Sequence, residues 1–206
     1  RNYLAWKEYT KEIAEILNMV TENIHIVGFS AGGAIAAYLA TLIDNPAERL
    51  NLTLLAPFFN PAKRGERIGL RVLRFLDRIT FGLVGRILDK IPHPVSRTIP
   101  ESQTPDFSLG QILSFNKFAN LVGSPVAEQL KCLSFFMGLV KDDDRICEPD
   151  ALDFFNRVPA DTPKGHYVFK ALDGEPALVH PGLFCPDYST ELAVSRRFRK
   201  FLALYD

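Results

Sequence analysis

The sequence predicts an α/β fold, a mostly parallel sheet with flanking helices and an inserted helical cap. Helical and strand segments alternate near both ends of the chain, as they do when parallel strands are joined by right-handed crossovers. The middle of the chain breaks this alternation with a basic helical stretch. The 206 residues, 47% hydrophobic and 23% charged, are enough to bury a substantial core.

The first four predicted elements establish the alternation. Residues 3–20 place apolar side chains at every third or fourth position and charged ones between them, which predicts an amphipathic helix. The β-branched residues 24–28 predict a buried strand, and the Ala-rich residues 32–43 predict a second helix. Residues 50–56 predict a second strand, parallel to the first.

The middle of the chain has a different character. Between positions 63 and 90, eight lysines and arginines stand against three acidic residues, with apolar residues interleaved. A proline-spaced stretch follows, and residues 109–121 again have a helical pattern. We interpret residues 61–130 as a helical cap, inserted between a first core segment, residues 1–60, and a second, residues 131–206.

The alternation returns in the second core segment. Residues 133–140 predict a strand and residues 150–157 a short helix. Residues 167–172 predict the fourth strand, and residues 190–204 a last amphipathic helix.

Charge and cysteine content exclude several classes of protein. The chain has 24 lysines and arginines and 24 aspartates and glutamates, so it lacks the net positive charge that is typical of a nucleic-acid-binding protein. Three cysteines are too few for a disulfide framework and lack metal-ligand spacing. No apolar run reaches the roughly 18 residues of a membrane span. No signal-peptide pattern follows Arg1, so the compartment is not assigned, and we expect a piece of a longer protein.

The sharpest local signal is the motif Gly28-Phe29-Ser30-Ala31-Gly32, which has the pattern G-x-S-x-G between a predicted strand and a predicted helix. Ser30 would occupy a tight, strained turn, and Gly28 and Gly32 would avoid collision with the neighbouring chain. The turn would lift the Ser30 hydroxyl above the sheet and place the Ala31 N–H where it can donate to a developing oxyanion. The alternative is a glycine-rich helix start without chemistry.

This motif in this context resembles the nucleophile elbow of the α/β-hydrolase superfamily, whose triad runs in the order nucleophile, acid, histidine. The resemblance implies an acid after a later strand, and Asp142, Asp143 and Asp144 follow the strand at 133–140. Asp144 aligns best with the family, since a β-branched residue and a proline follow it, and Asp143 is the alternative. A solvated acidic loop that caps the next helix is the competing interpretation.

The resemblance also implies a histidine after the last strand. His180 lies in the loop before the last predicted helix, where the family has its general base, and His166, just before the fourth strand, is the alternative. His25, inside the first strand, is interpreted as structural, and His93, between prolines, as part of a loop.

The implied reaction is acyl transfer by a Ser-His-Asp triad, without a metal or organic cofactor. Ser30 would attack a carbonyl carbon, His180 would take its proton, and Asp144 would orient the imidazole. An apolar cap suits a small-molecule carboxylic ester or thioester with an apolar acyl group. The alternatives are a catalytically silent binding domain, and a peptidase or C–C hydrolase on the same fold.

Two further partners are expected. The family's sheet usually has eight strands, whereas only four are predicted here, so an upstream segment or a second chain should cover the edge of the strand at 24–28. The family's second oxyanion donor has no counterpart in this sequence, which leaves the Ala31 N–H as the one predicted donor.

The basic and apolar residues 63–90 are compatible with an anionic membrane surface, although a cap helix packed on the core is favoured.

Overall fold

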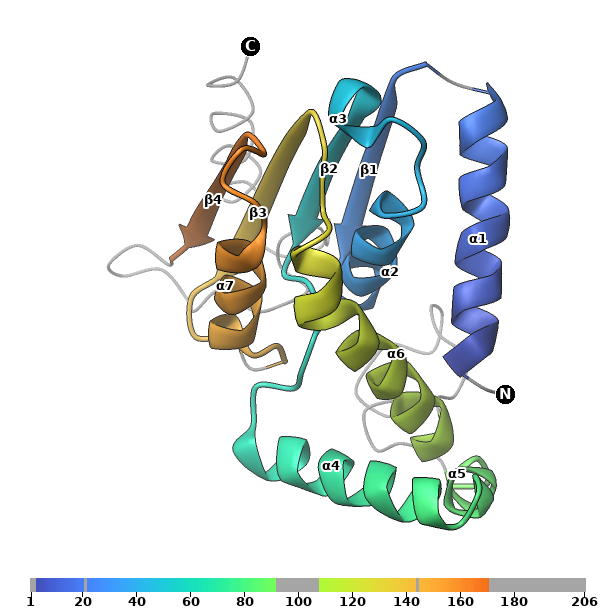
Figure 1. The fold of residues 1–206 in the computed structure, drawn as a ribbon. Helices are drawn as coiled ribbons and strands as arrows, with labels where there is room; N and C mark the ends of the chain where they lie inside the picture. The colour runs from blue at the N-terminus through green and yellow to red at the C-terminus, as the bar shows by residue number, and fades with distance from the viewer. Residues whose placement is uncertain (1–2, 21, 92–107, 144, 171–206) are drawn as a thin grey trace, which may run out of the picture.

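The computed structural model describes residues 3–20, 22–91, 108–143 and 145–170. They form one four-stranded sheet, with helices stacked on one face and a pair of helices beyond one end (Figure 1). The strands are β1 (Ile24–Phe29), β2 (Leu50–Leu55), β3 (Ser134–Val140) and β4 (Lys164–Phe169). The helices are α1 (Tyr3–Val20), α2 (Ala31–Ala40), α3 (Pro46–Arg49), α4 (Arg64–Ile79), α5 (Leu83–Leu88), α6 (Leu109–Ala127) and α7 (Glu148–Arg157).

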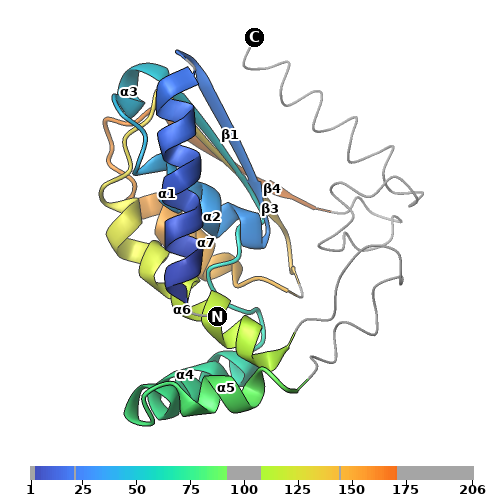
Figure 2. The same ribbon diagram turned by 90° about the vertical axis from the view of Figure 1, so that its right-hand side faces the viewer.

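The sheet is parallel throughout, in the order β1-β2-β3-β4, which confirms the predicted fold class. Helices α1, α2, α6 and α7 cover one face (Figure 2). That face buries the alternate apolar residues of the strands, Ile24, Ile26, Leu50, Leu52, Leu54, Phe135, Met137 and Leu139. The first strand is not buried on both faces as expected, because His25 and Val27 point the other way and are exposed.

The first three strands and the first helix lie where the sequence predicts them, within one or two residues. The prediction for the fourth strand is wrong by three residues, since β4 begins at Lys164. Lys164, Gly165 and His166 have little strand propensity, but they pair with Phe135, Phe136 and Met137 of β3, and pairing to a central strand outweighs propensity. The short helix α3 was not predicted, and the predicted helix at 190–204 lies outside the described residues.

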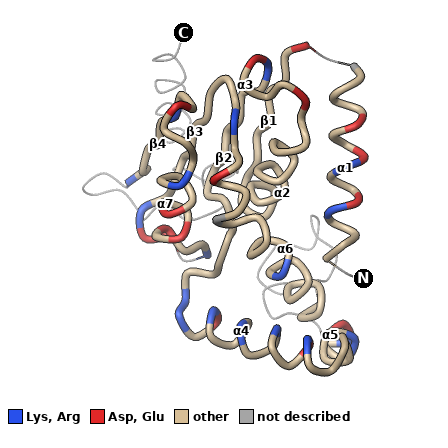
Figure 3. The backbone as a smooth tube through the Cα atoms, in the orientation of Figure 1, with Lys and Arg blue, Asp and Glu red and all other residues tan. Residues whose placement is uncertain are grey.

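The chain leaves the sheet between β2 and β3 and forms α4, α5 and α6. The second half of α6 belongs to the core beneath the sheet, where Phe118, Val122 and Val126 are buried. The first half of α6 packs against α4 and α5, which lie beyond the carboxyl ends of the strands (Figures 1 and 3). A kink at Gly123, with φ −45° and ψ −121°, lies within the second half, about one turn before the helix ends at Ala127.

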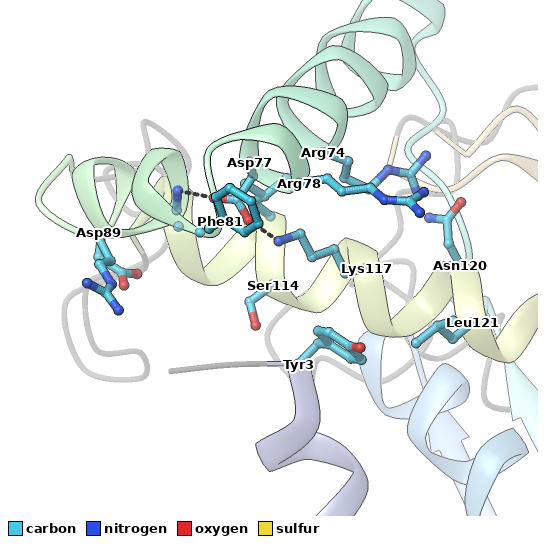
Figure 4. A pocket seen from close by; sticks show the side chains of 15 residues that line it. Tyr3, Arg74, Asp77, Arg78, Phe81, Asp89, Ser114, Lys117, Asn120 and Leu121 are labelled. Atoms are coloured by element: carbon cyan, nitrogen blue, oxygen red, sulfur yellow. Dashed lines mark hydrogen bonds and ion pairs between the residues drawn. The ribbon is translucent and has the colours of Figure 1, made fainter.

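A buried ion pair joins these three helices. Asp77 is the one buried residue of α4, at 4% exposure, and its carboxylate pairs with Lys117 of α6 (Figure 4). The same carboxylate accepts a hydrogen bond from the Gly85 N–H of α5. Between α4 and α5 the chain turns at Gly82, whose φ of 89° suits a residue without a Cβ. In the described part of the chain, no helix is long and apolar enough to span a bilayer.

Removing the Asp77 charge is expected to loosen this junction. Burial by itself raises the pKa of Asp77, but the hydrogen bonds from Lys117 and Gly85, with the Lys117 charge, lower it overall. A carboxyl whose pKa is lowered by folding stabilises the fold above its unfolded pKa, and that contribution is lost as the pH falls through the folded pKa. Asp77→Asn should therefore lower the free energy of unfolding at neutral pH by about 1.5–3 kcal/mol, as measured by urea denaturation.

The matched control is Asp161→Asn at an exposed carboxylate, which should cost less than about 0.5 kcal/mol. The difference between wild type and Asp77→Asn should shrink when the pH is lowered below about 4. Equal losses in both variants, or a difference that grows toward low pH, would contradict this role for Asp77.

Candidate active site

Ser30 occupies the turn between β1 and α2, with φ 52° and ψ −120°, a conformation that L side chains rarely adopt. Three backbone hydrogen bonds hold it there. The Ser30 N–H donates to the Leu55 carbonyl at 3.0 Å, and the Ser30 carbonyl accepts from the N–H groups of Gly33 at 2.9 Å and Phe58 at 2.8 Å. The end of β2 and the segment after it thus impose the strained conformation, whose cost is about 1–3 kcal/mol.

The glycines around Ser30 differ in how closely other parts of the chain approach them. A Cβ on Gly28 would lie 2.6 Å from the Ala36 Cβ, so Gly28 lets α2 approach β1. The prediction of a similar collision at Gly32 is wrong, because beyond α2 itself no atom of the described residues lies within 4 Å of a Cβ placed there. The close approach occurs one residue later, since a Cβ on Gly33 would lie 2.7 Å from the Pro57 Cβ. In the sequence, the second glycine of the pair Gly32-Gly33 is the signal for this close approach.

Ala31 is the first residue of α2 and is exposed. The N–H groups in the first turn of a helix have no partner within the helix, and the helix dipole makes them favourable donors to an anion. The Ala31 N–H is thus next to the Ser30 side chain and available to a negatively charged oxygen.

The predicted acids follow β3, at the same edge of the sheet as Ser30 because the strands are parallel. Asp142 is exposed, with a φ of 57°. Asp143 is buried at 7% exposure, and its Oδ1 accepts hydrogen bonds from the N–H groups of Arg145 at 2.7 Å and Ile146 at 3.2 Å. Asp143 therefore holds the backbone of Arg145 and Ile146, and Asp144 lies outside the described residues.

His180 and His93 also lie outside the described residues. His166 lies inside β4, opposite Met137 of β3, rather than before the strand. Its ring centroid is 4.7 Å from that of Phe155 in α7, on the helix-covered face. Since β1 and β4 are three strand spacings apart, or about 14 Å, the structure does not bring His166 to Ser30. His25 is exposed on the opposite face of β1.

Apolar side chains adjoin the Ser30 turn. Phe58, whose N–H binds the Ser30 carbonyl, has its ring centroid 5.9 Å from that of Phe115 in α6. The Phe115 ring in turn meets Trp6 of α1 edge-on, with centroids 5.6 Å apart. Phe59 points into the core and stacks on Phe154 at 4.5 Å. Phe58, which is half-buried, thus links the Ser30 turn to α6, and half-buried Phe29 precedes Ser30 in the chain.

A cavity of about 740 Å³ lies elsewhere, between α4, α5, α6 and the start of α1. Its wall includes Tyr3, Arg74, Arg78, Lys117 and Leu121 (Figure 4), and of the predicted site residues that the structure describes, among them Ser30, Asp143 and His166, none lines it. Across residues 3–20, 22–91, 108–143 and 145–170, no group of three or more histidine, cysteine, aspartate or glutamate side chains could hold a metal ion.

No protein-family model matches the sequence, and no curated protein matches it. Several solved structures do match. A monoacylglycerol lipase from Paleococcus ferrophilus is 18% identical, with a TM-score of 0.62 over 100% of this chain and 78% of that chain. A structure from work on the metagenome-derived lipolytic enzymes LipS and LipT is 14% identical, with a TM-score of 0.64 over 97% and 73%. A thermostable carboxyl esterase from Bacillus coagulans is 16% identical, with a TM-score of 0.56 over 98% and 72%. At these identities the likeness establishes the fold.

Strain at position 30 predicts an unusual order of stabilities. Glycine adopts the observed φ without steric cost, whereas alanine does not. Ser30→Gly should therefore unfold at a higher urea concentration than Ser30→Ala, with a free energy of unfolding about 1 kcal/mol larger. Because glycine normally lowers stability relative to alanine, the opposite order would show that the turn is unstrained.

The two glycines of the motif should respond differently to the same substitution. Gly28→Ala forces a Cβ against Ala36 and should lower the free energy of unfolding by about 1–3 kcal/mol. Gly32→Ala places its Cβ in open space and serves as the matched control, with a change of less than about 1 kcal/mol. Thermal denaturation of the two variants measures this difference, and similar losses in both would contradict the packing account.

Proposed function

The chain carries part of an α/β-hydrolase fold, and from that premise we propose that it is a serine hydrolase acting on a carboxylic ester or thioester with an apolar acyl group. The observation that carries the proposal is the strained backbone of Ser30, held between β1 and α2 by three hydrogen bonds. Strain of this kind persists where the surrounding structure enforces it, and such places are commonly functional sites.

In the proposed reaction, the Ser30 Oγ attacks the carbonyl carbon of the ester while His180 accepts the hydroxyl proton. The carbonyl oxygen becomes an oxyanion, which the Ala31 N–H stabilises at the start of α2. The bond to the leaving alcohol or thiol then breaks, and His180 returns the proton to it. Water, deprotonated by His180, releases the acid from the acyl-enzyme and restores Ser30.

We propose Asp144 as the acid that orients His180. The family resemblance favours Asp144, since a β-branched residue and a proline follow it. The Oδ1 of Asp143 accepts hydrogen bonds from two backbone N–H groups, which gives Asp143 a role in the fold of this loop. Asp143 remains the alternative acid, and the variants below separate the two.

The apolar surroundings support the choice of substrate. The backbone of Phe58 binds the Ser30 carbonyl, and its ring contacts Phe115, so aromatic residues close along the chain and in α6 lie near the turn where an acyl chain would enter. Residues 61–130, which include α4 and α5 beyond the carboxyl ends of the strands, would act as the cap. We further propose that another segment or chain pairs with β1, which has β2 as its only strand neighbour among the described residues, and supplies the second oxyanion donor.

The test uses a fluorophosphonate probe, which labels activated serine hydroxyls, together with ester turnover by the intact protein. Ser30→Ala and His180→Ala should abolish labelling and lower turnover at least about 10³-fold. Asp144→Asn should lower turnover by a similar factor, whereas Asp143→Asn should act mainly on stability. A greater rate with long-chain than with short-chain esters would support the apolar substrate.

His166→Ala is the matched control for His180→Ala, because the structure places His166 away from Ser30, and it should keep turnover within a few-fold of wild type. Labelling that survives in Ser30→Ala would refute the nucleophile. An unlabelled wild type would identify a silent domain on the same fold.

A further inference from the structure

Helix α4 buries a charge and exposes most of its large apolar side chains. Its one buried residue is Asp77. Leu70 and Leu73 are half-buried on the same side of the helix as Asp77, and the other large apolar side chains face outward. We call these side chains the apolar stripe: Ile68 (52% exposed), Val72 (51%), Phe75 (62%), Leu76 (38%) and Ile79 (54%). A helix that packs on a core buries such a stripe and exposes its charges, so packing within the described chain does not explain this arrangement.

The stripe continues beyond α4. The neighbouring turn and α5 add Phe81 (95% exposed), Leu83 (55%) and Ile87 (55%). At about 100° per residue, Ile68 and Ile79 lie opposite Asp77 around the helix axis. The stripe therefore points directly away from the ion pair that fastens α4 to α6.

A row of arginines runs along one flank of the stripe. Arg64, Arg71 and Arg78 follow one another every seven residues on α4, which places them next to the apolar residues around the helix axis. None of the three has a carboxylate partner among the described residues. We call them the arginine row. An apolar face with cations beside it is the pattern of a helix that lies in the headgroup region of a membrane.

The position of α4 and α5 places the apolar stripe at one end of the molecule. Both lie beyond the carboxyl ends of the strands, the end at which Ser30 stands (Figures 1 and 2). A lipid surface against the stripe would thus be at the same end of the molecule as the candidate nucleophile. At 16 residues, α4 is shorter than a membrane-spanning helix, so it would lie along the surface.

We propose that the apolar stripe and the arginine row dock this protein on an anionic lipid surface. The charge selects this occupant over a second copy of the chain. A second copy would bring the same basic surface, since residues 63–90 carry eight lysines and arginines against three acidic residues, and like charges would oppose association. The proposal does not depend on the chemistry of Ser30, and its test is separate from the labelling of that residue.

The test places a reporter on the stripe of the full chain. Trp6→Phe removes the only tryptophan of the chain, and Phe75→Trp places a new one on the stripe of α4. The same protein carries Ser30→Ala, so that it cannot hydrolyse the lipid of the vesicles. Tryptophan emission should be that of an exposed indole in buffer and should shift to the blue with phosphatidylcholine–phosphatidylserine vesicles. Pure phosphatidylcholine vesicles should give a much smaller shift.

Two sets of variants assign the contacts, with vesicle co-sedimentation as the measurement. Phe75→Ser with Ile79→Ser should weaken binding at least about tenfold. Replacing all three arginines together, by Arg64→Gln, Arg71→Gln and Arg78→Gln, should weaken vesicle binding about 100-fold, because each arginine near an anionic surface strengthens binding roughly fivefold. The control is Ile16→Ser with Met19→Ser on α1, which are 54% and 76% exposed and should leave binding within about twofold.

Three results would overturn the proposal. Emission already blue in buffer would mean that protein covers the stripe, either this chain or a second copy. No shift with anionic vesicles would exclude lipid docking. Equal shifts with both kinds of vesicle would show that the arginine row does not recognise anionic headgroups.

Discussion

The backbone turn at Ser30 is the constraint on which the rest of the site depends. Its strained φ and ψ persist because Leu55 and Phe58 bind it from the end of β2 and the segment beyond. Gly28 and Gly33 allow α2 and Pro57 to approach closely enough for those bonds to form. The parallel register of β1 and β2 therefore decides where the Ser30 side chain stands, and the start of α2 places the Ala31 N–H beside it.

A buried ion pair, rather than a strained turn, holds the insertion between β2 and β3 together. The carboxylate of Asp77, which receives Lys117 and the Gly85 N–H, joins its helices, and α6 supplies apolar contacts with the sheet core through Phe115, Phe118, Val122 and Val126. An ion pair sheltered from water is specific in geometry but adds little net stability. The apolar stripe of α4 faces outward, at the end of the molecule where Ser30 lies.

Local patterns in the sequence were sufficient for much of this architecture. The periodicity of residues 3–20 and the apolar run of β3 predicted their elements, because side-chain spacing alone identifies them. Nonlocal effects were harder to predict. Strand β4 starts at Lys164 because it pairs with β3, and the close contact of Gly33 depends on Pro57, 24 positions later in the sequence. The outward stripe of α4 also required knowledge of what α4 packs against. Neither Asp144 nor His180 lies in the described residues, so their roles rest on the resemblance.

The central claim is that Ser30 is an activated nucleophile, and one distance tests it most directly. A crystal structure of the intact protein at neutral pH would measure the separation of the Ser30 Oγ from the nearer ring nitrogen of His180. The account predicts a hydrogen bond of roughly 2.6–3.2 Å, with the other ring nitrogen on a carboxylate of Asp144. An imidazole at position 180 on another side of the sheet, with Ser30 facing no base, would contradict it.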